Sequence, residues 1–133
     1  MTAAPTLRVL DLDAFLALPG EALPIGIARR PVLRGAEVTS MRASVPPGTD
    51  IPPHVHPKGK AALIFVLAGE LQLGLGKAFD AAGLRRIGPA GVAVLRADDP
   101  AHFARTGAEG AEFLVIAAPP ELVDPAILGA PAP

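Results

Sequence analysis

The stretch from residue 45 to residue 70 decides the fold of this chain and reads VPPGTDIPPHVHPKGKAALIFVLAGE. It opens with a Pro-Pro-Gly sequence that stops the preceding apolar segment. A polar loop that carries His54 and His56 follows, and then an apolar run over 62–68 that ends at Gly69. A short apolar run bounded by glycine is typical of a buried β-strand. The stretch therefore predicts two strands joined by a histidine-bearing loop.

The rest of the chain shows the same pattern of short apolar segments and turns. Its 133 residues fit one domain, and 14 Gly and 16 Pro supply many turns. Strands are predicted at 23–29, 36–45, 62–68, 71–75, 79–86, 92–96, 102–106 and 112–118, after a short helix at 11–18. Strands at a spacing of about ten residues predict an all-β barrel or sandwich. The expected organisation is an N-terminal helix and edge strand over 1–35, a barrel over 36–120 and a tail over 121–133.

Composition excludes several classes of function. The formal net charge is −1 and no basic run occurs, so the electrostatic footprint of a nucleic-acid-binding protein is missing. No apolar stretch reaches the ~18 residues that span a bilayer, and no secretory signal pattern opens the chain. We therefore expect a cytoplasmic protein without nucleic-acid or membrane partners. The absence of Cys excludes disulfides and thiolate chemistry, and Tyr and Trp are absent as well.

The three histidines are the candidate metal ligands. His54 and His56 are two residues apart, so in an extended chain their side chains point to the same side. A third ligand must come from elsewhere, and His102 is the remaining imidazole. It lies on a different predicted strand, which a barrel can bring to the same interior. The pattern predicts one divalent metal ion on His54, His56 and His102.

These residues resemble the two sequence motifs of the cupins. The first motif is matched by Gly48, five residues, His54-Val55-His56 and, later, Gly69. The second is matched by Gly91, the strand 92–96, a Pro-containing turn and His102, with Thr106 where Asn is usual. The resemblance covers residues 37–118. It implies a single cupin-type β-barrel, also called a double-stranded β-helix or jelly roll, with a three-histidine site for iron, manganese, zinc or nickel.

One departure from the family pattern concerns the metal ligands. The first motif normally supplies a Glu ligand, but the corresponding position falls on Lys60, Ala61 or Ala62, depending on which end of the motif is counted from. Asp50 and Glu70 are the nearest acids. Three neutral imidazoles leave the charge of a dication uncompensated. Such an ion is a stronger Lewis acid and should favour anionic ligands.

The resemblance implies a metal-dependent enzyme, a non-haem iron-type dioxygenase or an enolate-forming lyase or isomerase, acting on a small anionic or dicarbonyl substrate. Lys60 near the histidines and Arg42 on the preceding strand are the candidate substrate-binding cations. The alternatives are a non-catalytic module that binds a metal or a small metabolite, and a metal-free barrel. Small cupins commonly pair, so a homodimer is expected.

Overall fold

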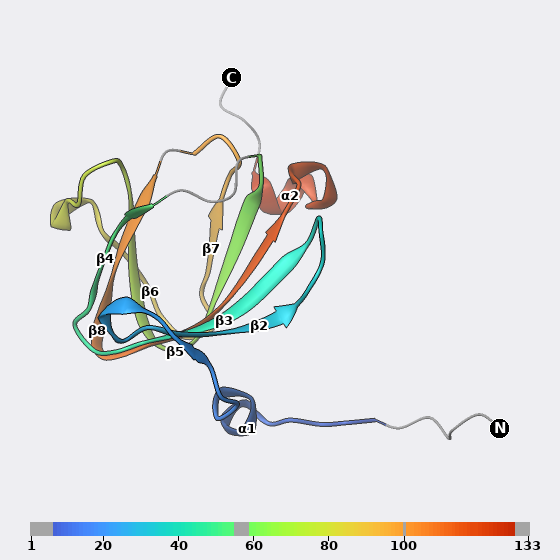
Figure 1. Cartoon of the computed structure of the whole chain (residues 1–133). Coiled ribbons are helices and arrows are strands. Elements are labelled where there is room, and N and C mark those ends of the chain that lie inside the picture. The colour runs from blue at the N-terminus through green and yellow to red at the C-terminus, as the bar shows by residue number, and fades with distance from the viewer. Residues whose placement is uncertain (1–6, 55–58, 100, 130–133) are drawn as a thin grey trace.

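The structure confirms the predicted fold class. It is a computed structural model that describes residues 7–54, 59–99 and 101–129, and half of these described residues form antiparallel β-structure. Figure 1 shows the strands in two layers that meet along one side and enclose an interior, with the N-terminal segment extending away from the body. Among the described residues, no helix is long and apolar enough to cross a membrane.

Within the described residues, the fold has eight strands and two short α-helices. The strands are β1 (Glu21–Ala22), β2 (Ala28–Leu33), β3 (Thr39–Val45), β4 (Asp50–His54), β5 (Ala61–Leu75), β6 (Arg85–Ile87), β7 (Val92–Leu95) and β8 (His102–Ala118). The helices are α1 (Leu12–Leu16) and α2 (Pro125–Leu128), with 3-10 turns at Pro24–Gly26, Ala81–Gly83 and Pro120–Leu122.

The two long strands β5 and β8 organise the barrel. They pair with each other from Ala61–Ala118 at one end to Leu75–His102 at the other, and both take part in two layers. One layer contains β1, β2, β3 and β7 beside the first half of β5 and the second half of β8. The other contains β4 and β6 beside the remaining halves. This is the double-stranded β-helix that the sequence predicts.

Two glycines allow β5 and β8 to bend between the layers. Gly69 and Gly110 have φ angles of 74° and 75°, a region that favours glycine. A Cβ atom on Gly69 would collide with the backbone oxygen of Gly110, so the two strands cross here at close range. The pairing shifts register at this point. A turn was predicted at Gly69-Glu70, but the backbone bends without leaving the ladder, and 62–68 and 71–75 form one strand.

The loop predicted for residues 50–60 is in part a strand. Asp50–His54 forms β4 although it contains Pro52 and Pro53. In the described part of the chain β4 pairs only with β8, so it is an edge strand. A proline is tolerated at an edge because no second neighbour needs its missing N–H. The strand predicted at 23–29 is instead the 3-10 turn Pro24–Gly26 followed by the first residues of β2.

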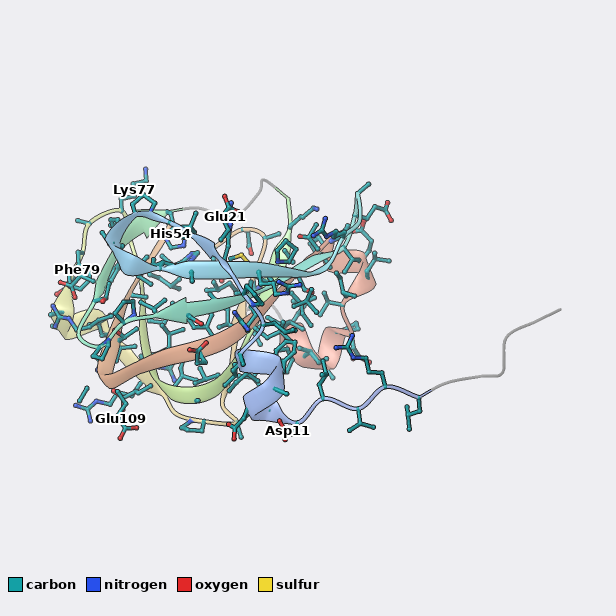
Figure 2. The ribbon with its side chains drawn as sticks, turned by 60° about the horizontal axis from the view of Figure 1, so that its bottom comes forward. Asp11, Glu21, His54, Lys77, Phe79 and Glu109 are labelled. Carbon is teal, nitrogen blue, oxygen red and sulfur yellow. The ribbon has the colours of Figure 1, made fainter. Side chains whose placement is uncertain are left out.

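The core lies between the two layers. Its buried apolar residues come from β3, β5, β7 and β8, and include Ala43, Val45, Ala62, Ile64, Val66, Leu71, Leu95, Ala104 and Phe113. The helix α1 is attached to β3 through Arg42, whose guanidinium donates to the backbone oxygens of Phe15 and Leu16. Figure 2 shows its N-cap residue, Asp11, on the opposite side of the molecule from His54.

Candidate metal and ligand site

A cavity of about 320 Å³ lies inside the barrel. Most of its wall is apolar, and the polar side chains that reach it come from two histidines and one arginine. The residues that line it are Leu23, Ile27, Arg29, Met41, Ala43, Val45, Ile51, His54, Ile64, Leu71, Leu73, His102, Ala104, Phe113 and Val115. The volume lies at the lower end of the range for small-molecule sites.

His54 and His102 meet at this cavity. They are Cα partners in the antiparallel pair of β4 and β8, so their side chains share one face of the sheet. The ring centroids are 4.0 Å apart, and the rings are inclined at 63° to each other. His102 is 3% exposed, whereas His54 is exposed at the cavity mouth. The structure thus brings together two of the three histidines that the sequence singled out.

The imidazole of His54 is oriented by the backbone. Its Nδ1 lies 2.9 Å from the carbonyl oxygen of Pro52. A carbonyl oxygen only accepts hydrogen bonds, so Nδ1 carries the proton and Nε2 keeps its lone pair. Metal-binding histidines commonly have this arrangement, in which the second ring nitrogen donates to a carbonyl or carboxylate. The local geometry of His54 therefore fits a metal ligand that uses Nε2.

The third predicted ligand, His56, lies outside the described residues. Among 7–54, 59–99 and 101–129, no three His, Cys, Asp or Glu side chains form a cluster that could hold a metal ion. A three-histidine site remains a prediction that rests on the spacing of His54 and His56 in the sequence.

Arg42 lies on the opposite face of β3 from the cavity. Met41, Ala43 and Val45 line the cavity, so the alternation of the strand turns Arg42 outward. The residue is 2% exposed, and its guanidinium donates to the backbone oxygens of Phe15, Leu16 and Leu18 at 2.7 to 2.8 Å. Arg42 thus attaches α1 to the barrel, and its position does not favour the predicted substrate-binding role.

Lys60 also points elsewhere. Its Nζ donates to the backbone oxygen of Ala36 at 3.4 Å, beside the turn between β2 and β3. It does not line the cavity. In this arrangement the ammonium group supports a surface turn.

Arg29 is the cation that the sequence analysis missed. It is the Cα partner of Ala43, which faces the interior, and its side chain lines the cavity. Glu21 lies 3.8 Å from its Nε. Two arginines and a proline in succession on β2 hide the alternation of that strand, so only the β2–β3 register reveals which arginine faces inward.

The position of the missing Glu ligand can be followed on β5. Ala62 and Ile64 share the inward face and belong to the core, and Ala62 is fully buried. Ala61 faces the other side of the sheet, and Lys60 precedes the strand. Of the three positions that counting allowed, Ala62 alone faces the interior.

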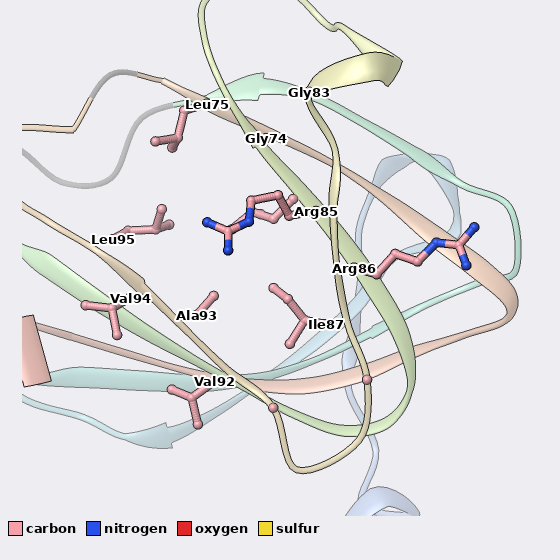
Figure 3. A pocket seen from close by; sticks show the side chains of 13 residues that line it. Gly74, Leu75, Gly83, Arg85, Arg86, Ile87, Val92, Ala93, Val94 and Leu95 are labelled. Carbon is pink, nitrogen blue, oxygen red and sulfur yellow. The ribbon is translucent and has the colours of Figure 1, made fainter.

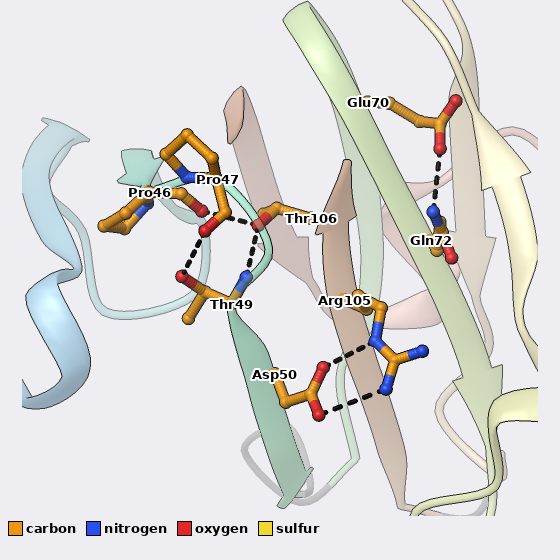
Figure 4. A network of polar contacts seen from close by, with 8 residues as sticks. All are labelled: Pro46, Pro47, Thr49, Asp50, Glu70, Gln72, Arg105 and Thr106. Atoms are coloured by element: carbon orange, nitrogen blue, oxygen red, sulfur yellow. Dashed lines mark hydrogen bonds and ion pairs between the residues drawn. The ribbon is translucent and has the colours of Figure 1, made fainter. Parts of the chain in front are cut away.

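The two acids considered as substitutes have other partners. Asp50 forms two hydrogen bonds to Arg105, with Oδ1 to Nε at 2.6 Å and Oδ2 to Nη2 at 3.2 Å (Figure 4). These bonds lower the pKa of the Asp50 carboxyl and raise that of the Arg105 guanidinium. Glu70 accepts a hydrogen bond from Gln72. Neither acid lines the cavity.

Thr106, which stands where the second motif usually has Asn, has a structural role. Its hydroxyl donates to the backbone oxygen of Pro46 at 2.5 Å and accepts from the backbone N–H of Thr49 at 2.9 Å (Figure 4). The side chain is 2% exposed. It fixes the turn that leads into β4 and hence the strand that carries His54.

Comparison with known proteins identifies the fold. No protein-family model matches the chain, and no curated protein sequence does. Solved structures are similar: a conserved protein with a double-stranded β-helix domain from Klebsiella pneumoniae is 21% identical with a TM-score of 0.64, covering 86% of this chain and 91% of that one. An RmlC-like cupin from Desulfovibrio desulfuricans is 18% identical with a TM-score of 0.58, covering 90% and 97%.

The cupin domain of Cnp3 from Schizosaccharomyces pombe is similar as well. It is 12% identical with a TM-score of 0.66, and the match covers 81% of this chain and 73% of that one. Identities this low show the architecture and leave the activity open. The chain has the cupin fold, with a pair of facing histidines at its interior cavity.

Proposed function

We propose that this protein binds one divalent metal ion through His54, His102 and His56 and uses the adjoining cavity to hold a small anionic molecule. The observation that carries the proposal is the pairing of His54 with His102 at the mouth of an otherwise apolar cavity. An exposed histidine pair on a sheet surface would have no such cavity beside it.

The donor set fits a divalent ion of the first transition series. Neutral imidazoles suit iron, nickel and zinc, and two imidazoles on facing positions of one ladder can reach one ion. The carbonyl oxygen of Pro52 holds His54 in the tautomer that ligation requires. His56 is included as the third ligand because it is two residues from His54 in the sequence. A metal ion bound here would act as a Lewis acid that polarises a bound oxygen atom.

The surroundings favour an anion as the second ligand. No acidic side chain in the described part of the chain lines the cavity, and Ala62 replaces the carboxylate expected on β5. Arg29 adds a positive charge on the facing layer, where the sequence analysis had expected Arg42 or Lys60. A molecule with a carboxylate or a dicarbonyl and a short apolar part would match both charge and volume. Oxidation or isomerisation of such a molecule would take place at this same site.

Metal titration of the purified protein tests the proposal. We expect calorimetry to show one Mn²⁺, Fe²⁺, Ni²⁺ or Zn²⁺ per chain, and elemental analysis of freshly purified protein to show bound metal. His102→Ala and His54→Ala should each lower the affinity at least about tenfold. Asp50→Asn is the matched control. Asp50 lies on β4, the strand that carries His54, but its carboxylate binds Arg105 and does not line the cavity.

The outcome of these measurements separates the alternatives. Metal binding that is equal in wild type and His102→Ala would refute the proposed ligands. Oxygen uptake with ferrous iron and a panel of small keto acids and β-diketones distinguishes an oxygenase from a binding module. A protein that binds metal and anion without consuming oxygen or converting the panel would be the non-catalytic binding module.

A further inference from the structure

A second pocket lies in the side wall of the barrel, between β6 and β7. Both strands neighbour β5, but β6 pairs with Leu71–Leu73 and β7 with Ala62–Phe65, so a gap remains between them. The pocket has a volume of about 680 Å³. The apolar side chains that line it are Leu73, Leu75, Ile87, Val92, Val94 and Leu95.

Arg85 projects into this pocket. It is the Cα partner of Leu73, which faces the interior, whereas the next residue, Arg86, is paired with the outward Gln72. Figure 3 shows the guanidinium of Arg85 extending among the apolar side chains toward Leu95, while that of Arg86 points the other way. Both arginines are exposed and both border the pocket, but their guanidinium groups point in opposite directions.

The two arginines also differ in their partners. Arg86 lies 3.9 Å from Oε1 of Glu70 on the outer face. Arg85 has no ion pair within the described residues, and none of those that line the pocket is acidic. A guanidinium can bind both carboxylate oxygens at once, through two parallel N–H···O hydrogen bonds. Charge and lining together define a site for an anion with an apolar body.

We propose that the β6–β7 pocket binds a small carboxylate with an apolar tail, such as a medium-chain fatty acid, with Arg85 pairing the carboxylate. The tail lies along the side chains of Ile87, Ala93 and Leu95, which line the pocket and face the interior like Arg85. Neither His54 nor His102 lines this pocket, although Leu75, which does, is the Cα partner of His102; occupation of the pocket requires no metal ion. The two pockets share Leu73 alone.

Octanoate is the probe, added to wild-type protein in the presence of EDTA and followed by calorimetry. EDTA removes any metal ion to which a carboxylate could bind at the histidines. We expect saturable binding by wild type, Arg86→Gln and His54→Ala with equal dissociation constants. Arg85→Gln should bind octanoate about tenfold more weakly, which corresponds to the loss of one charge-assisted pair. Octanol, which has the same tail without the charge, should bind wild type as weakly as octanoate binds Arg85→Gln.

Three results would overturn the proposal. Wild type could fail to bind octanoate at millimolar concentration, or Arg85→Gln could bind it as tightly as wild type. Loss of binding in His54→Ala would place the probe in the other cavity. An inward charge on an edge strand can also serve only to prevent pairing with other chains. In that case light scattering would show that Arg85→Gln self-associates, while its affinity for octanoate would equal that of wild type. This result would also contradict the proposed site.

Discussion

His54 and His102 stand directly opposite each other on β4 and β8, with ring centroids 4.0 Å apart. His102 is on a strand with neighbours on both sides, whereas His54 is on an edge strand. The buried imidazole is therefore fixed by the sheet, and the exposed one is oriented by Pro52 and reached first from solvent. This asymmetry suits a site with one rigid ligand and one at the entrance.

Arg42 should stabilise the protein by holding α1. Its buried guanidinium donates to three backbone oxygens of the helix and of the residues that follow it. Replacement by Met removes these bonds and leaves carbonyl groups without donors. We expect Arg42→Met to lower the free energy of unfolding by about 2–4 kcal/mol, measured by urea denaturation. Hydrogen exchange of the amides in α1 should also become faster.

Arg30→Met is the control for this prediction. Arg30 donates to the single backbone oxygen of Pro19, so its loss should cost only about 1 kcal/mol. Anion binding provides a second readout, because Arg42→Met should leave it unchanged while Arg29→Met weakens it. If Arg42→Met were as stable as wild type but bound the anion more weakly, Arg42 would be a substrate ligand after all.

The pair of Asp50 and Arg105 should make stability depend on pH in the acid range. The hydrogen bonds from Arg105 lower the pKa of Asp50 in the folded state below its ordinary value of 3.8. The pair therefore stabilises the protein fully above pH 3.8, and this contribution is lost as the pH falls through the lowered pKa. Melting temperatures of wild type and Asp50→Asn should differ at neutral pH and converge in acid. A difference that grows with acidity would contradict this sign.

Much of the fold could be predicted from local patterns. Two local signals predict strands: the apolar run 62–68 and the alternation of Leu71 and Leu73. The Pro-Gly sequences predict the turns between strands. The continuity of β5 and β8 could not be predicted, because it depends on the close crossing of Gly69 and Gly110, which are far apart in sequence. The strand β4 was missed for a similar reason, since its prolines are allowed only by its edge position.

The candidate site was predicted in part. The spacing of His54 and His56 singled out the first pair, and His102 followed as the remaining imidazole. The structure places His54 and His102 side by side, and His56 lies outside the described residues. The prediction of Arg42 and Lys60 as substrate-binding cations was not supported. The register of β2 against β3 decides which arginine faces inward, and it places Arg29 there. Alternation was weak on both strands, and no local signal shows which face is buried.

The outer edge of β2 should mediate homodimer formation. One edge of β2 pairs with β3. On the other edge β1 pairs only with Ala28 and Arg29, so the rest of that outer edge has no partner strand in the described structure. Val32 and Leu33 are 40% and 52% exposed there. Such an edge can pair with a second copy of the chain. We expect light scattering to report a dimer for wild type and for Val92→Lys, and a monomer for Val32→Lys; a monomeric wild type would contradict the prediction.

Ala62→Glu should supply the carboxylate that the site lacks. Ala62 faces the interior at the start of β5, where it is the Cα partner of Leu95 and Ala117. Figure 1 shows this end of β5 and the beginning of β8 at the same open end of the barrel, and β8 begins at His102. Without metal, a carboxylate at this fully buried position should destabilise the fold by several kcal/mol, on the order of 2–5.

Added metal should restore the stability that Ala62→Glu loses, and it should not do so for a Glu on the opposite face of β5. A bound dication would compensate the new carboxylate, so added Zn²⁺ should raise the melting temperature of Ala62→Glu more than that of wild type. Affinity for small carboxylates should fall, because one charge is cancelled and one coordination position is taken. Ala61→Glu is the control, since Ala61 is equally buried but faces the other side of the sheet. If Ala62→Glu, like Ala61→Glu, melts lower and gains nothing from metal, position 62 is not where a metal ligand can act.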